Sequence, residues 1–228
     1  MLIRKKGNIF TTKCQTIVNT VNCVGVMGAG IAYEFRLRYP NMFEKYKTIC
    51  ENKQLDIGKL WIYSSDDKKV LNFPTKYHWK YLSKEEYLHK GLKKFVETYK
   101  EKNISSIAFP LLGADKGGLE KENVLKIMEF YLSQCDIDIE IWEFDPKAED
   151  DLYKQFKSIF NKLDDNTIKN DSKVRIDLIK KVRIVLNTDE VNSFTGLLGI
   201  KGIGDSTLEK LFKYINEYEK KNINLFSY

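Results

Sequence analysis

The feature that most constrains this chain is a regular alternation of strand-type and helix-type segments through its first two thirds. Several strand-type segments are almost continuously apolar, which is typical of strands buried on both faces of a sheet. The predicted strands are residues 2–5, 16–22, 59–63, 69–73, 104–110 and 137–144. The predicted helices are residues 30–39, 42–52, 83–100 and 121–134, and Ser83 with Glu86 forms a capping box at the third. We therefore predict an α/β fold in three layers, with a mixed, largely parallel sheet between helices.

The rest of the chain divides into a helix, a polar stretch and a second helical piece. A helix running from Pro146 to Leu163 carries four apolar side chains along one face: Leu152, Phe156, Ile159 and Phe160. The stretch 164–172 is polar and has few apolar residues, so it is predicted to be a linker. The predicted domains are therefore residues 1–163, a linker over 164–172, and a small all-α domain over 173–228.

Positive charge is concentrated in the first part of the chain. The net charge is +6, and residues 1–100 contain 19 Lys and Arg against 9 Asp and Glu. A basic region of this kind favours an anionic ligand or partner. A solvated, lysine-rich surface explains the charge equally well, so charge alone leaves both interpretations open.

The cysteine and histidine content argues against a metal site. The four cysteines have no CxxC spacing, and the only histidines are His78 and His89. We therefore expect no metal and no cofactor.

No run of about 18 apolar residues exists, and the first residues lack the apolar core of a signal peptide. We expect a cytoplasmic protein without a membrane span.

Two glycine-rich loops follow predicted strands, at the sheet edge where such folds bind ligands. Residues 19–32 run from a strand through the first loop into a helix, whose N-terminus offers free N–H groups to a phosphate. Asn19 and Asn22 add short amides that suit ribose hydroxyls. Residues 109–119 repeat the pattern, so the two loops can hold a diphosphate from both sides. A tight strand–helix turn is the alternative for the first loop alone.

A lysine among aromatic residues follows a third strand. In the stretch 72–79, Lys76 comes after a proline turn and before Tyr77, His78 and Trp79. Partial loss of hydration lowers the pKa of such an amine and makes it a candidate nucleophile or general base. An ordinary solvated lysine beside aromatic core residues is the alternative.

Taken together, these segments resemble the macrodomain family over about residues 6–163. Residues 7–9 resemble its first-strand signature, which contacts adenine, and the two glycine loops resemble its ribose and phosphate loops. The stretches 18–28 and 72–79 resemble more narrowly the DNA ADP-ribosyl glycohydrolases of DarTG toxin–antitoxin systems (DarG-type antitoxins). The related branch is the terminal ADP-ribose protein glycohydrolase.

The resemblance implies an ADP-ribose site in which Lys76 is catalytic. Lys76 would attack the anomeric carbon of the distal ribose or assist the opening of that ring. The residues that the resemblance assigns to ADP-ribose binding are Gly7, Asn8, Ile9, Asn19, Asn22, Gly25, Val26, Met27, Gly28, Ala29, Gly30, Ile31, Thr75, Leu112, Gly113, Ala114, Asp115, Lys116, Gly117, Gly118 and Leu119.

Two positions depart from the family pattern. The aspartate of the first-strand signature is Asn8 here, and an amide can still accept a hydrogen bond from adenine. The second catalytic aspartate of the protein-directed branch falls on Gly117, with Asp115 two residues away. The second departure favours the DNA-directed branch.

The C-terminal part resembles a helix-hairpin-helix around residues 199–204. In that motif, hairpin amides bind a nucleic-acid phosphate without reading sequence, and here Lys201, Gly202, Gly204 and Lys210 would make the contact. A glycine turn within a small helical bundle is the alternative.

The sequence thus predicts an enzyme that hydrolyses the bond between ADP-ribose and a modified nucleic acid, most simply a DNA base. The alternatives are a non-catalytic ADP-ribose reader and a hydrolase of ADP-ribosylated protein side chains or O-acetyl-ADP-ribose. The implied partners are ADP-ribose, ADP-ribosylated DNA or RNA, and a DarT-like ADP-ribosyltransferase.

Overall fold

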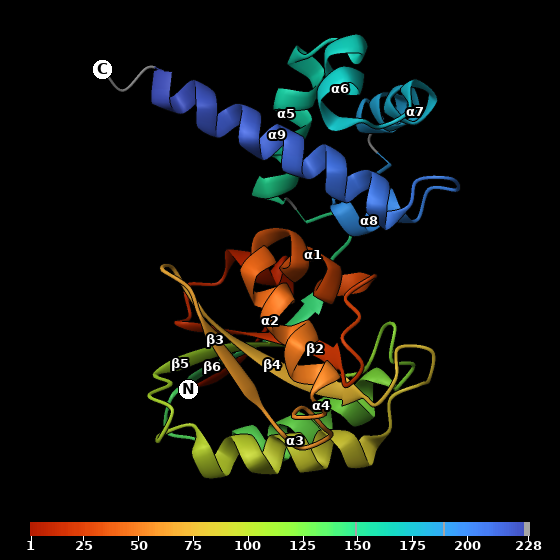
Figure 1. The fold of residues 1–228 in the computed structure, drawn as a ribbon. Helices are drawn as coiled ribbons and strands as arrows, with labels where there is room; N and C mark the ends of the chain where they lie inside the picture. Colours follow the sequence, from red (N-terminus) through yellow and green to blue (C-terminus); the bar gives the residue numbers. More distant parts are fainter. Residues whose placement is uncertain (149, 189, 226–228) are drawn as a thin grey trace. The chain divides into compact units, whose positions relative to one another are not determined.

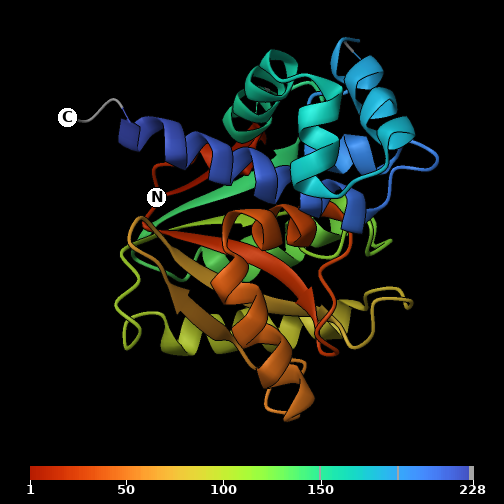
Figure 2. The same ribbon diagram turned by 45° about the horizontal axis from the view of Figure 1, so that its top comes forward.

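The computed structural model describes residues 1–148, 150–188 and 190–225, and the chain falls into two compact units (Figures 1 and 2). The first unit is Met1–Asp145, and the second begins at Pro146. No helix in the described part of the chain is long and apolar enough to cross a membrane.

The first unit is built on a mixed sheet of six strands within the described residues, in the order β1-β6-β5-β2-β4-β3. The strands are β1 (Leu2–Gly7), β2 (Thr16–Asn22), β3 (Trp61–Ser64), β4 (Lys69–Lys76), β5 (Ser106–Pro110) and β6 (Asp138–Phe144). All neighbours are parallel except β3, which pairs antiparallel with β4 at the edge. The carboxyl ends of β6, β5, β2 and β4 therefore lie side by side at one edge.

Helices cover both faces of this sheet, as the alternating sequence pattern predicts. On one face, α3 (Glu85–Thr98) and α4 (Lys121–Leu132) bury Leu92, Phe95 and Met128 against the strands. On the other face, α1 (Gly30–Arg38) and α2 (Pro40–Glu51) do the same with Phe35, Met42 and Tyr46. The predicted three-layer α/β/α fold is confirmed, and η1 (Ile9–Thr11) follows β1 as a short 3-10 turn.

Two local predictions in this unit are wrong. The strand expected over residues 69–73 continues to Lys76, so that lysine is the last residue of β4 rather than part of a loop. The capping box of Ser83 and Glu86 does not form, because α3 begins at Glu85 with Lys84 as a cap that makes no side-chain hydrogen bond. Ser83 is instead buried, and its backbone N–H donates to the Gly117 carbonyl at 2.9 Å.

The second unit is helical and begins earlier than the sequence pattern indicates. Its helices are α5 (Asp151–Lys162), α6 (Asp165–Ser172), α7 (Ile176–Leu186), α8 (Phe194–Leu198) and α9 (Asp205–Leu225). We expected α5 to belong to the first domain, whereas its Phe156 packs edge-on against Phe194 and stacks on Phe212 of this unit. The division lies near residue 145 rather than at 163.

The expected linker over residues 164–172 is also wrong, because it contains helix α6. Asp164 caps this helix by accepting hydrogen bonds from Asn166 and Thr167, both at 3.0 Å. One apolar residue, Ile168, is fully buried and attaches the helix to its neighbours. The polar composition of this stretch therefore did not indicate the helix, which depends on the Asp164 cap and on one buried apolar residue, Ile168.

Candidate functional site

Three loops meet at the carboxyl edge of the sheet. They are the first glycine loop (residues 22–30, after β2), the second glycine loop (residues 111–120, after β5) and the segment between β4 and α3. Backbone hydrogen bonds connect them: the Cys23 N–H donates to Tyr77 at 3.0 Å, and Ser83 donates to Gly117 at 2.9 Å. The structure thus brings together the three segments that the sequence singled out.

The first glycine loop is organised by one side chain, Asn22. Its Oδ1 accepts hydrogen bonds from the backbone N–H groups of Val24 at 3.0 Å and Val26 at 3.3 Å. Its Nδ2 donates to the Val26 carbonyl at 2.6 Å, and the Tyr46 hydroxyl donates to Oδ1 at 3.1 Å. The Asn22 amide therefore shapes the loop from inside rather than facing a ribose.

Asn19 lies inside the sheet and does not reach the loop surface. It is fully buried, and its Nδ2 donates to Asn72 Oδ1 at 2.9 Å across the β2–β4 pair. Because β2 continues to Asn22, Asn19 is three residues inside a strand covered by helices on both faces. The structure places this amide beneath the loop surface, and its contact with a ribose stays a prediction.

The second glycine loop folds back on itself so tightly that it excludes a side chain. A Cβ atom added at Gly117 would lie 2.0 Å from the Gly113 carbonyl oxygen, and one at Gly118 would lie 2.9 Å from Leu82. The N–H of Leu119 donates to the Gly113 carbonyl at 3.0 Å and closes the turn. An aspartate does not fit at 117, and Asp115 is exposed two residues away.

Lys76 lies between the two glycine loops. From the end of β4 its Nζ donates to the backbone carbonyl of Lys116 in the second loop. Partial burial lowers the pKa of the Lys76 amine, and the positive charge of Lys116 lowers it further. On the other side, the Cys23 thiol contacts the Lys76 carbonyl at 3.6 Å, and burial raises the pKa of that thiol to about 12. The neighbouring thiol stays neutral, and Lys76 is the group with a lowered pKa.

The remaining predicted contacts divide into surface and supporting positions. Exposed or partly exposed positions, which can touch a ligand, are Gly25, Val26, Gly28, Ala29, Gly30, Ile31, Asp115, Lys116, Gly118 and Leu119. Buried positions, which support the loops from below, are Met27, Thr75, Leu112, Gly113, Ala114 and Gly117. A carbon added at Gly30 would lie 3.7 Å from the Lys116 side chain, so the two loops approach each other closely.

The predicted adenine end lies where β1 and β6 finish. Asn8 caps the turn after β1, its Oδ1 accepting from the Phe10 N–H at 3.0 Å, and Ile9 is buried beneath it. Sequence reasoning missed Phe144, which pairs with Gly7 in the β1–β6 register and is 47% exposed. An exposed ring at the end of a buried strand is a surface on which a flat base can stack. Its position as the last residue of the predicted strand 137–144 was the available signal.

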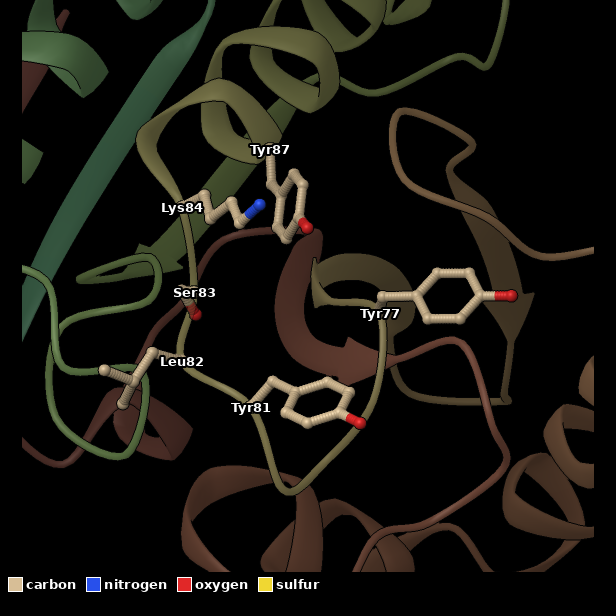
Figure 3. Close-up of a pocket in the computed structure, with 6 residues that line it drawn as sticks. All are labelled: Tyr77, Tyr81, Leu82, Ser83, Lys84 and Tyr87. Atoms are coloured by element: carbon tan, nitrogen blue, oxygen red, sulfur yellow. The ribbon is translucent and has the colours of Figure 1, made fainter.

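Sequence reasoning also missed the aromatic residues after Lys76 as a surface feature. A pocket of about 470 Å³ is lined by Tyr77, Tyr81, Leu82, Ser83, Lys84 and Tyr87 (Figure 3). The density of aromatic residues in this stretch was visible in the sequence, where they were considered only as the surroundings of Lys76.

In the second unit, residues 199–204 join α8 to α9, and their assignment to a helix-hairpin-helix stays a prediction. Gly202 has a φ of 86° at the turn, and the Lys181 side chain donates to the Lys201 carbonyl. The Asp205 carboxylate accepts from the Ser206 N–H at 2.8 Å at the start of α9. The contact by Lys201, Gly202, Gly204 and Lys210 remains a prediction.

Among the described residues, no three His, Cys, Asp or Glu side chains gather closely enough to hold a metal ion. The chemistry available at the site is that of an amine of lowered pKa beside two loops rich in backbone N–H groups. Such a site can bind an anionic ligand and present a nucleophile to it.

Comparison with known proteins identifies the same region. A family model described as Macro domain matches residues 18–128, from β2 into α4. The DNA ADP-ribosyl glycohydrolase of Mycobacterium tuberculosis is 38% identical over 147 residues, which cover 62% of this chain and 42% of that protein. The chain therefore spans about two fifths of the length of the curated relatives it matches.

Solved structures of these relatives also resemble this chain in fold. The macrodomain of Mycobacterium tuberculosis DarG superposes with a TM-score of 0.60 at 39% identity, covering 62% of this chain and 97% of that one. Thermosipho africanus DarTG in complex with ADP-ribose superposes with a TM-score of 0.58 at 36% identity, covering 60% of this chain and 40% of that one.

Proposed function

Because this chain belongs to the macrodomain family, we propose that it is an ADP-ribosyl hydrolase that releases ADP-ribose from modified nucleic acid, most simply a DNA base. The observation that carries the proposal is the position of Lys76, an amine of lowered pKa held between two glycine loops. The relatives named DNA ADP-ribosyl glycohydrolase support the choice of reaction.

The order of strands gives ADP-ribose a direction across the sheet edge. Adenine would lie against Asn8 and Phe144 where β1 and β6 end, and the diphosphate between the loops after β5 and β2. The distal ribose would then reach Lys76 at the end of β4. Three strand spacings separate β6 from β4, or roughly 14 Å, which suits an extended ligand.

In the proposed reaction, the neutral Lys76 amine attacks the anomeric carbon of the distal ribose. The bond from that carbon to the base breaks, and its electron pair leaves with the base, which takes up a proton. Water then hydrolyses the lysine adduct, releases ADP-ribose and restores the amine. A lowered pKa increases the fraction of neutral amine near pH 7, as this step requires. Assistance of ribose ring opening by the same amine is the other form of the step.

An aspartate side chain does not fit at position 117. This supports the DNA-directed reaction over the protein-directed one. A DarT-like ADP-ribosyltransferase is the proposed source of the substrate, since one relative is a fusion of transferase and glycohydrolase.

The proposed location is the cytoplasm. The buried free thiols Cys14, Cys23 and Cys50 suit a reducing compartment.

The proposal is tested by ADP-ribose release from ADP-ribosylated single-stranded DNA, comparing the full chain with Lys76→Ala. Release by the wild type that is lost in the variant supports it. Binding of ADP-ribose without release from DNA, RNA or protein substrates would mean that the chain is a reader. Faster release from an ADP-ribosylated peptide or O-acetyl-ADP-ribose would favour the third alternative.

A further inference from the structure

The segment from Tyr77 to Tyr87, here called the aromatic segment, exposes an unusual amount of apolar surface. Tyr77 is 56% exposed, Trp79 49%, Tyr81 66% and Leu82 68%. Contiguous exposed apolar side chains on one loop mark a binding surface more often than single ones do. Because these side chains are exposed, packing in the hydrophobic core does not explain them.

The rings of this segment pack mainly on each other and on cations. The His78 ring stacks on Trp79 with centroids 5.6 Å apart and contacts Tyr81 at 5.3 Å. The Lys80 ammonium lies 5.1 Å from the Trp79 ring centroid, and Lys84 lies 5.7 Å from that of Tyr87. Figure 3 shows the Lys84 side chain running along the Tyr87 ring at the rim of the pocket.

The aromatic segment is fixed beside the proposed reaction centre at both of its ends. It starts at the residue after Lys76, where Tyr77 accepts from the Cys23 N–H at 3.0 Å, and Ser83 donates to Gly117 at 2.9 Å. Leu82 packs against Gly118 of the second glycine loop. A leaving group bonded to a ribose at Lys76 would therefore emerge next to these rings.

We propose that the aromatic segment binds the single-stranded nucleic acid that flanks the modified base. Stacking on aromatic faces beside positive charge is the chemistry by which proteins hold single strands without reading sequence. Tyr77, Trp79 and Tyr81 supply the rings, while Lys80 and Lys84 supply charge for the phosphates. The proposal rests on the proposed function and names the substrate class of that site.

The direction of the ligand explains why the rings serve the nucleic acid rather than ADP-ribose. Adenine is proposed to lie where β1 and β6 end, three strand spacings from β4, so the start of the aromatic segment, directly after β4, lies at the distal-ribose end of the ligand. Two carboxylates of the segment, Glu85 and Glu86, lie in the first turn of α3 and limit the basic surface to the loop before this helix. The strand is therefore expected to contact the loop and not the helix.

A test independent of turnover uses the fluorescence of Trp79. The other two tryptophans, Trp61 and Trp142, are less exposed and lie outside the segment. Titration of the full chain with unmodified oligothymidylate should quench the emission, and Trp79→Phe should remove the quenching while still binding. Unchanged emission on saturation would overturn the proposal.

The second test compares steady-state release of ADP-ribose from ADP-ribosylated single-stranded DNA. The double variant Tyr77→Ala with Tyr81→Ala should raise KM about fivefold or more and change kcat little, because stacking holds substrate and transition state equally. Phe130→Ala, which removes an exposed ring on α4 (66% exposed), is the matched control and should behave as wild type.

The outcomes separate this inference from the proposed function. Equal KM values for the double variant and wild type, with release still lost in Lys76→Ala, would overturn the inference alone. Weaker binding of free ADP-ribose by the double variant would also overturn it, because the rings would then belong to the ADP-ribose site. Quenching by oligothymidylate in a chain that releases nothing would support the inference and refute the reaction.

Discussion

The two glycine loops follow neighbouring parallel strands and lead into helices, yet they are held in opposite ways. In the first loop, the Asn22 side chain binds three donors, the N–H groups of Val24 and Val26 and the Tyr46 hydroxyl. In the second loop, the turn closes around Gly117, where an added Cβ atom would lie only 2.0 Å from a carbonyl oxygen.

The difference shows that one sequence pattern, a strand followed by glycines and a helix, can be stabilised by a side chain or by the lack of one. A loop held by an amide is sensitive to the loss of particular hydrogen bonds. A loop held by close backbone packing is sensitive to the addition of any side chain. The following predictions test this distinction, from the largest expected effect to the smallest.

Gly117→Ala should have the largest effect, because the added carbon collides with the Gly113 backbone, which cannot move away as a flexible side chain can. We expect a loss of about 3 kcal/mol of unfolding free energy. Tryptophan fluorescence during denaturation measures it, since Trp61, Trp79 and Trp142 all lie in the first unit. Gly28→Ala, with no atom closer than 3.8 Å to the new carbon, is the steric control. Equal losses in both variants would contradict the account.

Asn22→Ala should have the next largest effect, because it leaves the backbone N–H groups of Val24 and Val26 without their acceptor. The Tyr46 hydroxyl keeps the Asn22 backbone carbonyl as its acceptor. We expect a loss of about 2 kcal/mol of unfolding free energy and weaker ADP-ribose binding. Asn22→Asp keeps the acceptor but places a negative charge beside the diphosphate site. Calorimetry should show that this variant binds ADP-ribose more weakly while remaining more stable than Asn22→Ala.

Tyr46→Phe removes the hydroxyl that donates to the Asn22 carbonyl at 2.7 Å and is expected to cost about 1 kcal/mol. Burial raises the pKa of Tyr46 well above its ordinary value, so the hydroxyl stays a donor across the working pH range. The difference in unfolding free energy between this variant and wild type should therefore stay constant from pH 6 to about pH 9. A loss that grows with pH in the variant alone would count against this assignment.

Lys116→Ala should have the smallest effect and should act on pH dependence rather than on stability. The Lys116 charge lowers the pKa of Lys76, and its backbone carbonyl is kept in the variant. Because the neutral amine reacts, release should rise with pH through the Lys76 pKa, which lies below the ordinary lysine value in wild type. The variant should shift this rise to higher pH, and Lys100→Ala, far from the loops, should not. An identical pH dependence of release in both variants would show that the Lys116 charge does not lower the pKa of Lys76.

Much of the fold could be predicted from the sequence, because buried parallel strands and amphipathic helices have different periods. Strand β2 was predicted with the same bounds that the structure gives, and both glycine loops were located. The burial of Asn19 was not foreseen, because the pattern does not show how far inside the sheet a residue lies. Helix α6 was missed because its stability depends on a cap and one buried apolar residue, Ile168. The exposure of the aromatic segment depends on tertiary packing, which no local pattern reveals.

The most direct test of the central claim is single-turnover release of ADP-ribose from ADP-ribosylated single-stranded DNA as a function of pH, in wild type and in Lys76→Ala. The account predicts that wild-type release rises with pH through an apparent pKa that lies below the ordinary lysine value. It also predicts that Lys76→Ala binds ADP-ribose but loses release by at least about a thousandfold. Release by Lys76→Ala within a few fold of wild type would show that this amine does not carry the reaction.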